Sequence, residues 1–185
     1  MFKDILFALW FFLPAGCANA TPIFLAKIPF LAQYDAPMDL GHTFHGKRVL
    51  GSHKTWRGLI GGIIAATLVL WLQQVLVGHT SWAATLTKEV DYTQLPTLIL
   101  GPLFGLGALL GDAIESFFKR QRGVAPGQGW FPFDQTDYII GGAVATAPFV
   151  HLHFLQYVWL LLLWLLVHVI ASYLGYLAKL KERPI

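Results

Sequence analysis

Residues 154–178 read FLQYVWLLLLWLLVHVIASYLGYLA and contain no Asp, Glu, Lys or Arg. A helix needs about 20 predominantly apolar residues to cross the hydrocarbon core of a bilayer, and this stretch is long enough. Working outward from it, further apolar stretches occupy residues 138–151, 95–115, 58–78 and 5–26. The sequence therefore predicts an all-α, polytopic membrane protein with about five transmembrane helices.

The composition of the whole chain agrees with this fold class. Of its 185 residues, 56% are hydrophobic and 12% are charged, whereas soluble domains are roughly one-quarter charged. We therefore expect a single integral membrane domain over residues 1–185. The net charge of +3 comes from basic residues in short loops that form no extended stripe, so no nucleic-acid partner is expected. The single cysteine, Cys17, indicates neither a disulfide nor a zinc site.

The distribution of Lys and Arg predicts how the five spans are oriented. Positive residues favour cytoplasmic loops, and alternate loops lie on opposite sides of a membrane. With the N-terminus outside, the inner side receives 11 of the 13 basic residues, namely Lys27, Lys47, Arg48, Lys54, Arg57, Lys119, Arg120, Arg122, Lys179, Lys181 and Arg183. We expect a multi-pass protein of the cell (inner) membrane with a cytoplasmic C-terminus.

The first apolar stretch is the least regular of the five. Pro14 and Pro22 interrupt residues 5–26, so a helix there is expected to be kinked. The alternative is a secretory signal peptide, because Lys3 precedes the apolar residues and the small residues at 18–20 resemble a cleavage site. The prolines weigh against that alternative, and a retained helix is preferred.

Polar residues gather on one face at the inner end of the third span. Asp112, Glu115, Ser116 and Lys119 are spaced i, i+3, i+4 and i+7, which places them on the same side of a helix. A carboxylate near the edge of an apolar helix is costly unless it meets water, a cation or a metal. A functional role is predicted, and an internal salt bridge from Asp112 to Lys119 or Arg120 is the structural alternative.

A basic, glycine-rich loop is predicted at residues 117–136. Its Lys119, Arg120 and Arg122 suit phosphate oxygens, and Gly123 and Gly127 let backbone N–H groups approach them. Contact with anionic lipid headgroups is the alternative explanation of the basic residues. That alternative does not explain the acids that follow.

Asp134 and Asp137 stand where the fourth span begins. Each alone could cap that helix or complement its dipole. Together with Asp112 they offer the carboxylates that Mg²⁺ prefers beside substrate phosphates, whereas clustered carboxylates without a metal repel one another. The sequence therefore predicts a Mg²⁺ site formed by Asp112, Asp134 and Asp137.

A second basic motif, GKRVLGSHKTWRG at residues 46–58, precedes the second span. Lys54 and Arg57 stand beside the positive end of the helix predicted from Gly58, which is a natural site for an anion. Charge anchoring at the membrane surface, with Trp56 as an interfacial aromatic residue, is the alternative.

These motifs resemble the CTP-dependent lipid cytidylyltransferases, and most closely the CDP-archaeol synthase family. The resemblance is carried by KTWRG at 54–58, GDAIES at 111–116, KR at 119–120 and PFDQTD at 132–137, with Asn19 near the N-terminus. The bacterial phosphatidate cytidylyltransferases share several of these elements but are much longer. The final span departs from the family pattern, because His168 is followed one turn later by Ser172 where the family usually has Asn.

The resemblance implies transfer of cytidylate from CTP to a membrane lipid phosphate, with release of pyrophosphate. The acceptor would be archaetidic-acid-like, an unsaturated isoprenoid glycerol ether phosphate, or phosphatidate, and a homodimer is left open. The implied catalytic residues are Lys54, Arg57, Asp112, Glu115, Lys119 and Arg120; the implied substrate-binding residues are Asn19, Thr55, Gly58, Ser116, Arg122 and Gln135; the implied Mg²⁺ ligands are Asp112, Asp134 and Asp137.

Other functions are weighed against this one. A CDP-alcohol phosphotransferase would carry an Asp-Gly-x-x-Ala-Arg signature, which the sequence lacks. A transporter or channel that uses Asp112 as an intramembrane relay predicts acids near the bilayer midplane and an inverted repeat. An assembly subunit is disfavoured by the number of ionisable residues in two short loops.

Overall fold

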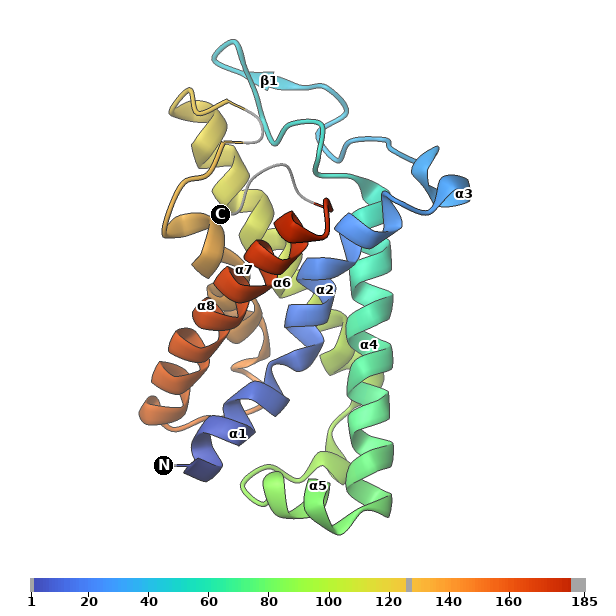
Figure 1. Cartoon of the computed structure of the whole chain (residues 1–185), viewed down its shortest axis with the longest axis vertical. Helices are drawn as coiled ribbons and strands as arrows, with labels where there is room; N and C mark the ends of the chain where they lie inside the picture. The colour runs from blue at the N-terminus through green and yellow to red at the C-terminus, as the bar shows by residue number, and fades with distance from the viewer. Residues whose placement is uncertain (1, 126–127, 181–185) are drawn as a thin grey trace.

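The computed structural model describes residues 2–125 and 128–180 of the chain, so Gly127, Lys181 and Arg183 of the sequence predictions lie outside the described residues. The chain is mostly helical (Figure 1). Its helices are α1 (Phe2–Phe11), α2 (Leu13–Leu25), α3 (Pro29–Ala32), α4 (Trp56–His79), α5 (Ser81–Leu86), α6 (Thr97–Gln121), α7 (Phe133–Thr146) and α8 (Phe154–Leu177), with a 3₁₀ turn, η1, at Tyr92–Gln94.

Three helices of the described residues are long and apolar enough to cross a membrane. They are α4, α6 and α8, with mean hydropathies of 2.0, 1.7 and 2.1. A fourth span is present if α1 and α2, which meet at an angle of 44°, count as one crossing. The break confirms the predicted kink: Pro14 lies in the first turn of α2, where its missing N–H is tolerated, and not inside a continuous helix.

The fourth predicted span differs most from its expected bounds. Residues 138–151 were expected to form it, whereas α7 covers Phe133–Thr146, beginning after Pro132 and ending before Pro148. Its 14 residues extend about 21 Å, less than the roughly 30 Å hydrocarbon core. The protein is a multi-pass membrane protein, while five crossings and an outside N-terminus stay predictions.

The third span is longer than its predicted range of 95–115. Helix α6 continues to Gln121, so Lys119 and Arg120 lie on its last turns and not in the predicted loop. Positive side chains near a helix C-terminus interact favourably with its dipole, which is the physical reason for the extension. The second span begins at Trp56, two residues before the predicted Gly58, because the Thr55 hydroxyl caps the helix by accepting the Gly58 amide at 3.2 Å.

A β-hairpin interrupts the otherwise helical chain between α3 and α4. Strands β1 (Thr43–Phe44) and β2 (Lys47–Arg48) pair antiparallel, with Thr43 opposite Arg48. The two residues that join them, His45 and Gly46, have φ values of 49° and 74°. A two-residue turn with positive φ at both positions matches the right-handed twist of a hairpin.

Aromatic side chains form the centre of the helical bundle. Phe12, at the break between α1 and α2, packs edge to face with Phe104 of α6, at 6.1 Å between ring centroids, and with Trp164 of α8, at 5.6 Å. The Trp164 indole N–H donates to the carbonyl oxygen of Ala8 at 3.1 Å. The N-terminal segment is therefore part of the core, contacting both α6 and α8.

Helices α6 and α7 approach so closely that their backbones touch. A Cβ atom at Gly141 would lie 2.2 Å from the carbonyl oxygen of Gly107, and one at Gly111 would lie 2.3 Å from the carbonyl oxygen of Asp137. Small residues permit such contacts between membrane helices. The contact places Asp112, which follows Gly111, beside the helix that carries Asp134 and Asp137.

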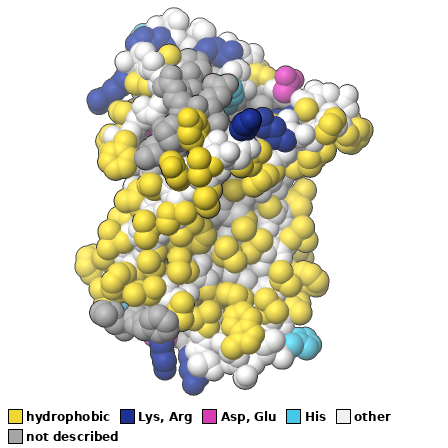
Figure 2. Space-filling model, in the orientation of Figure 1, with side chains coloured by type: hydrophobic (Ala, Val, Ile, Leu, Met, Phe, Trp, Pro, Cys, Tyr) yellow, Lys and Arg dark blue, Asp and Glu magenta, His cyan; other side chains and the backbone are white. Residues whose placement is uncertain are grey.

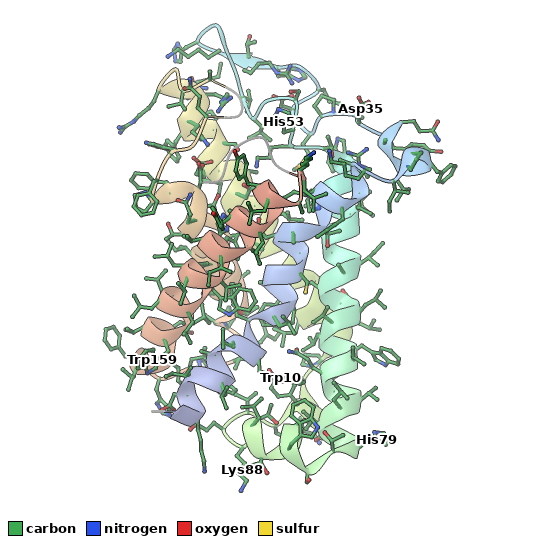
Figure 3. The ribbon with its side chains drawn as sticks, in the orientation of Figure 1. Trp10, Asp35, His53, His79, Lys88 and Trp159 are labelled. Atoms are coloured by element: carbon green, nitrogen blue, oxygen red, sulfur yellow. The ribbon has the colours of Figure 1, made fainter. Side chains whose placement is uncertain are left out.

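The surface separates into an apolar belt and two charged ends. Figure 2 shows hydrophobic side chains along the helices, with Lys and Arg gathered above and below them. In Figure 3, Asp35 and His53 lie at one end, and His79 and Lys88 lie at the other. The hairpin and the loop before α4 thus lie on the opposite side of the belt from the N-terminus and the 79–94 loop, as the five-span interpretation requires.

Substitution of Gly141 by Ala tests the α6–α7 contact. The added methyl group would overlap the α6 backbone, so we expect the free energy of unfolding to fall by about 1–3 kcal/mol. Thermal unfolding in detergent measures this change. Gly78→Ala is the matched control, because a Cβ atom there meets nothing within 4 Å. An unchanged unfolding temperature for Gly141→Ala would contradict the contact.

Candidate active site

A cavity of about 650 Å³ opens among α2, α4, α6, α7 and α8, at the end of the molecule that carries the loop before α4. Its walls come from parts of the chain that are far apart in sequence. The predicted site residues that line it are Asn19, Lys54, Thr55, Arg57, Gly58, Asp112, Glu115, Ser116, Lys119, Asp134 and Gln135.

Three predicted site residues lie outside this cavity. Arg120 lines a smaller hollow of about 320 Å³ together with Lys47 and Arg48. Arg122 and Asp137 line a groove between α6 and α7, where the Arg122 guanidinium lies 5.8 Å from the centre of the Trp130 ring. The fold therefore separates Arg120 and Arg122 from the basic residues of the cavity, Lys54, Arg57 and Lys119, although Arg120 directly follows Lys119 in the sequence.

Lys54 and Asp112 join the two sequence motifs across the cavity. The Lys54 Nζ atom lies 2.5 Å from the Oδ2 atom of Asp112. Two backbone hydrogen bonds hold the Lys54 segment in place. The Lys54 carbonyl oxygen accepts the Met38 amide at 2.7 Å, and the amide of Trp56, two residues further on, donates to the carbonyl oxygen of Ala36 at 3.1 Å. Asp112 of α6 is thus paired with a residue from the loop before α4. The alternative prediction of a salt bridge from Asp112 to Lys119 or Arg120 is not observed.

Lys54 stays positively charged in this position. Burial by itself lowers the pKa of an amine, but the carboxylate of Asp112 attracts the ammonium group and accepts its hydrogen bond. The attraction outweighs burial and raises the pKa of Lys54 above its ordinary value. The cavity therefore contains a fixed cation at neutral pH.

Lys119 forms the second ion pair of the cavity. Its Nζ atom lies 2.6 Å from Asp134 Oδ1 and 3.8 Å from Glu115 Oε1. The other oxygen of Asp134 accepts the Trp130 amide at 2.6 Å. Lys119 is only 8% exposed, so this ion pair is largely withdrawn from solvent. Lys119 reaches α7 because it lies two turns beyond Asp112 on the same face of α6.

Arg57 contributes a third cation from the first turn of α4. Its Nη1 atom donates to the carbonyl oxygens of Leu31 and Ala32, at 2.8 and 3.0 Å. Its Nε atom is buried and has no hydrogen-bond partner. Arg57 thereby fixes the end of α3 to α4 and retains an unused donor near the cavity.

Asp39 organises the loop that covers the cavity. Its carboxylate accepts hydrogen bonds from the Arg48 guanidinium at 2.6 and 3.1 Å and from the amides of Gly41, Leu50 and Gly51, each at 3.0 Å. Burial alone would raise the pKa of Asp39, but these donors lower it far below its ordinary value. Asp39 was not among the predicted site residues; its position two residues before a glycine, typical of an Asx turn, was the available signal.

Other cavity residues were also missed as site candidates. The predicted site residues did not include Asp35, Met38, Ser52 and His53, which belong to the covering loop, or His168 of α8. These loop positions carry no spacing pattern, because the chain between α3 and α4 is irregular. Tertiary contacts alone bring them over α6.

The carboxylates offer an incomplete set of metal ligands. Among residues 2–125 and 128–180, no three His, Cys, Asp or Glu side chains are arranged to hold an ion, and Asp112 and Asp134 are instead paired with Lys54 and Lys119. The Oδ2 atom of Asp137 and the Oε1 atom of Glu115 are nevertheless buried without hydrogen bonds. Unsatisfied carboxylate oxygens are hard ligands, so the donor set suits Mg²⁺.

Asp39→Asn tests the organisation of the loop. An amide cannot accept all the bonds that the carboxylate accepts, so hydrogen exchange at Leu50 and Gly51 should accelerate about tenfold or more. Exchange measured by mass spectrometry at peptide level reports this. Asp91→Asn, in the loop at the other end of the molecule, should leave both amides unchanged.

The pH dependence of the same amides follows from the lowered pKa of Asp39. A carboxylate with a lowered folded-state pKa stabilises above its ordinary pKa of about 3.9, and this contribution disappears only as the pH falls through the folded-state value. Protection of Leu50 and Gly51, corrected for intrinsic exchange, should therefore persist at pH 4. Loss of protection between pH 6 and pH 4 would refute the proposed role of the carboxylate.

Comparison with known proteins agrees with the motifs that the cavity assembles. The family model described as CarS-like, CDP-archaeol synthase, matches residues 1–185. A CDP-archaeol synthase of Pyrococcus furiosus is 32% identical over 181 residues, covering 97% of this chain and 98% of the relative. Its counterpart from Thermococcus gammatolerans is 34% identical over 184 residues, covering 98% and 97%.

A solved structure shares the fold as well. It belongs to an intramembrane enzyme for archaeal membrane lipid biosynthesis. The two structures superpose with a TM-score of 0.67 at 30% sequence identity, and the superposition covers 89% of this chain and 92% of the solved chain. The family model matches the whole chain, the relatives are covered almost completely, and the fold is shared. We conclude that this protein belongs to the CDP-archaeol synthase family.

Proposed function

We propose that this protein transfers the cytidylyl group of CTP to the phosphate of an archaeol-type lipid, giving a CDP-lipid and pyrophosphate. The observation that carries the proposal is the cavity in which Lys54 and Lys119, from two separate motifs, lie among carboxylates at one end of membrane-embedded helices. The relatives named CDP-archaeol synthase support an isoprenoid ether lipid as the acceptor.

The reaction requires positive charge more than it requires a nucleophilic side chain. An oxygen of the lipid phosphate attacks the α-phosphorus of CTP, and a new P–O bond forms while the bond from the α-phosphorus to the bridging oxygen breaks. Pyrophosphate leaves with that electron pair. Because both reactants are anions, catalysis depends on positioning and on neutralising charge. The lipid phosphate ionises near neutral pH, so no general base is needed.

The two lysines of the cavity are the groups that meet this demand. Lys54 and Lys119 can donate charge-assisted hydrogen bonds to phosphate oxygens, and both already lie in the cavity as ammonium groups held by acids. When phosphates replace Asp112 and Asp134 as partners of the lysines, those carboxylates are released. The ion pairs therefore keep the cations in place before the substrate binds.

The carboxylates that the lysines release, together with the unsatisfied oxygens, would hold a divalent cation. We assign Asp112, Asp134 and Asp137 to Mg²⁺, as the sequence predicts, and Glu115 contributes a further unsatisfied oxygen beside them. A Mg²⁺ ion held by these carboxylates would supply positive charge to offset the charge of the departing pyrophosphate. Ser116, Thr55 and Gln135 line the same cavity and can orient the ligands through hydrogen bonds.

The proposed orientation places the cavity on the cytoplasmic side, where CTP is found. The excess of Lys and Arg on the loops at this end supports that side. A transporter is less well supported, because its relay would require carboxylates near the bilayer midplane. Here Asp112 and Glu115 lie toward the end of α6, and Asp112 is paired with Lys54.

Purified protein supplied with labelled CTP and Mg²⁺ tests the proposed reaction. We expect labelled CDP-lipid with an unsaturated isoprenoid glycerol ether phosphate, and a lower rate with phosphatidate. Product formation is measured by thin-layer chromatography, and pyrophosphate is measured in parallel. Folded protein that produces neither CDP-lipid would exclude cytidylyl transfer.

Asp112→Asn and Asp137→Asn test the assigned cation ligands. Each substitution removes a negative charge from the site, so the rate should fall about 100- to 1000-fold. The thermal unfolding of both variants is measured to establish that they fold. Asp91→Asn, at the other end of the molecule, should retain full activity. Wild-type rates in folded Asp137→Asn would exclude Asp137 as a ligand.

A further inference from the structure

A narrow slot of about 140 Å³ lies between α2 and α8, directly beside the active-site cavity. The slot and the cavity share wall residues, so they adjoin each other within the described part of the chain. The shared residues are Asn19 and Ile23 of α2 and His168 and Ser172 of α8. In Figure 1 these two helices run side by side on the face toward the viewer.

The two ends of the slot differ in chemistry. At the outer end, Phe24 and Ala171 are exposed on the sides of α2 and α8, and Phe24 is 55% exposed. At the inner end stand Asn19, His168 and Ser172, polar residues on otherwise apolar helices, and Ser172 is only 3% exposed. The slot thus leads from the apolar surface to the polar cavity.

The inner wall of the slot is held in place by other helices. The His168 ring lies 5.5 Å from the Tyr138 ring of α7, and the Tyr138 hydroxyl donates to the carbonyl oxygen of Trp164 at 3.1 Å. Tyr138 and Trp164 also line the slot. These contacts fix the walls of the slot, and ligand-binding sites are usually largely pre-formed.

We infer that this slot admits a hydrocarbon chain of the lipid phosphate, so that the phosphate enters the cavity while the chain stays in the bilayer. The inference rests on the proposed function. A hydrocarbon chain that passed through the cavity would contact Lys54, Asp112 and Lys119. Such contact is costly, because it replaces the polar surroundings of these charged side chains with hydrocarbon. A lateral, apolar path avoids this cost. Asn19 and Ser172 then lie where the glycerol oxygens pass.

A second apolar surface competes for the chain. The groove between α6 and α7 has a volume of about 650 Å³ and includes Leu110, Ile114 and Val144. Among the described residues, however, it shares only Glu115 with the cavity. A chain in this groove would approach the reaction through a carboxylate and not through neutral polar groups. The slot, which shares four residues with the cavity, adjoins it over the larger wall and is therefore favoured.

Tryptophan substitutions that fill each surface distinguish these routes. Ala171→Trp narrows the slot at its exposed end. We expect it to raise the KM for a long-chain lipid phosphate about tenfold or more, because binding of several methylene groups is lost. The KM for CTP and the rate with a short-chain lipid phosphate, whose chains end before the slot, should stay at wild-type values.

Two further variants serve as matched controls. Val144→Trp fills the α6–α7 groove, and Ile170→Trp adds the same ring beside Ala171 at a residue that is 50% exposed and lines neither surface. Both should behave as wild type. Equal effects of Ala171→Trp on long and short lipids, or a chain-length effect confined to Val144→Trp, would overturn the inference.

Photo-cross-linking of the wild type decides the case independently of activity. A lipid phosphate with a diazirine near the glycerol end of its chain should label peptides of α2 and α8. Labelling of α6 and α7 alone would overturn the inference even if Ala171→Trp failed to fold. If α2 and α8 are labelled but no CDP-lipid forms, the proposed reaction fails while the slot is retained.

Discussion

Helices α6 and α7 touch through their backbones because glycine stands at the points of closest approach. Gly107, Gly111 and Gly141 leave no room for a Cβ atom, and this contact brings the end of α6 against the start of α7. Two acidic motifs that are about 20 residues apart in sequence thereby share one end of the bundle. Any side chain at these positions would separate the carboxylates on which the site depends.

Concentrating acids in this way is unfavourable unless cations accompany them. Lys119 comes from the same helix and neutralises Asp134, whereas Lys54 comes from the loop before α4 and neutralises Asp112. Removing one member of a buried ion pair is costly, because its partner stays buried and charged. Lys119, whose side chain is 10% exposed, is the member to which this applies most directly. The ion pairs also hold the lysines where phosphates would replace the carboxylates.

The loop over the cavity obtains its shape from a buried anion. Asp39 gathers backbone amides and Arg48 around one carboxylate, which explains how a chain with little regular structure is held between α3 and α4. The hairpin that it includes directs Lys47 and Arg48 toward the smaller basic hollow beside Arg120. The same loop carries Lys54 to the α6 carboxylate. Its order and the geometry of the cavity are consequently linked.

The sequence by itself determined the membrane class, the kink before α2, the family motifs and the face on which Asp112, Glu115, Ser116 and Lys119 lie. These features follow from local apolar length, from the missing N–H of proline and from helical spacing. The tertiary structure alone established which acid meets which lysine, that Arg120, Arg122 and Asp137 lie outside the main cavity, and that α7 begins at Phe133. Such outcomes depend on the close approach of helices and on loop contacts between residues far apart in the chain, which local patterns do not encode.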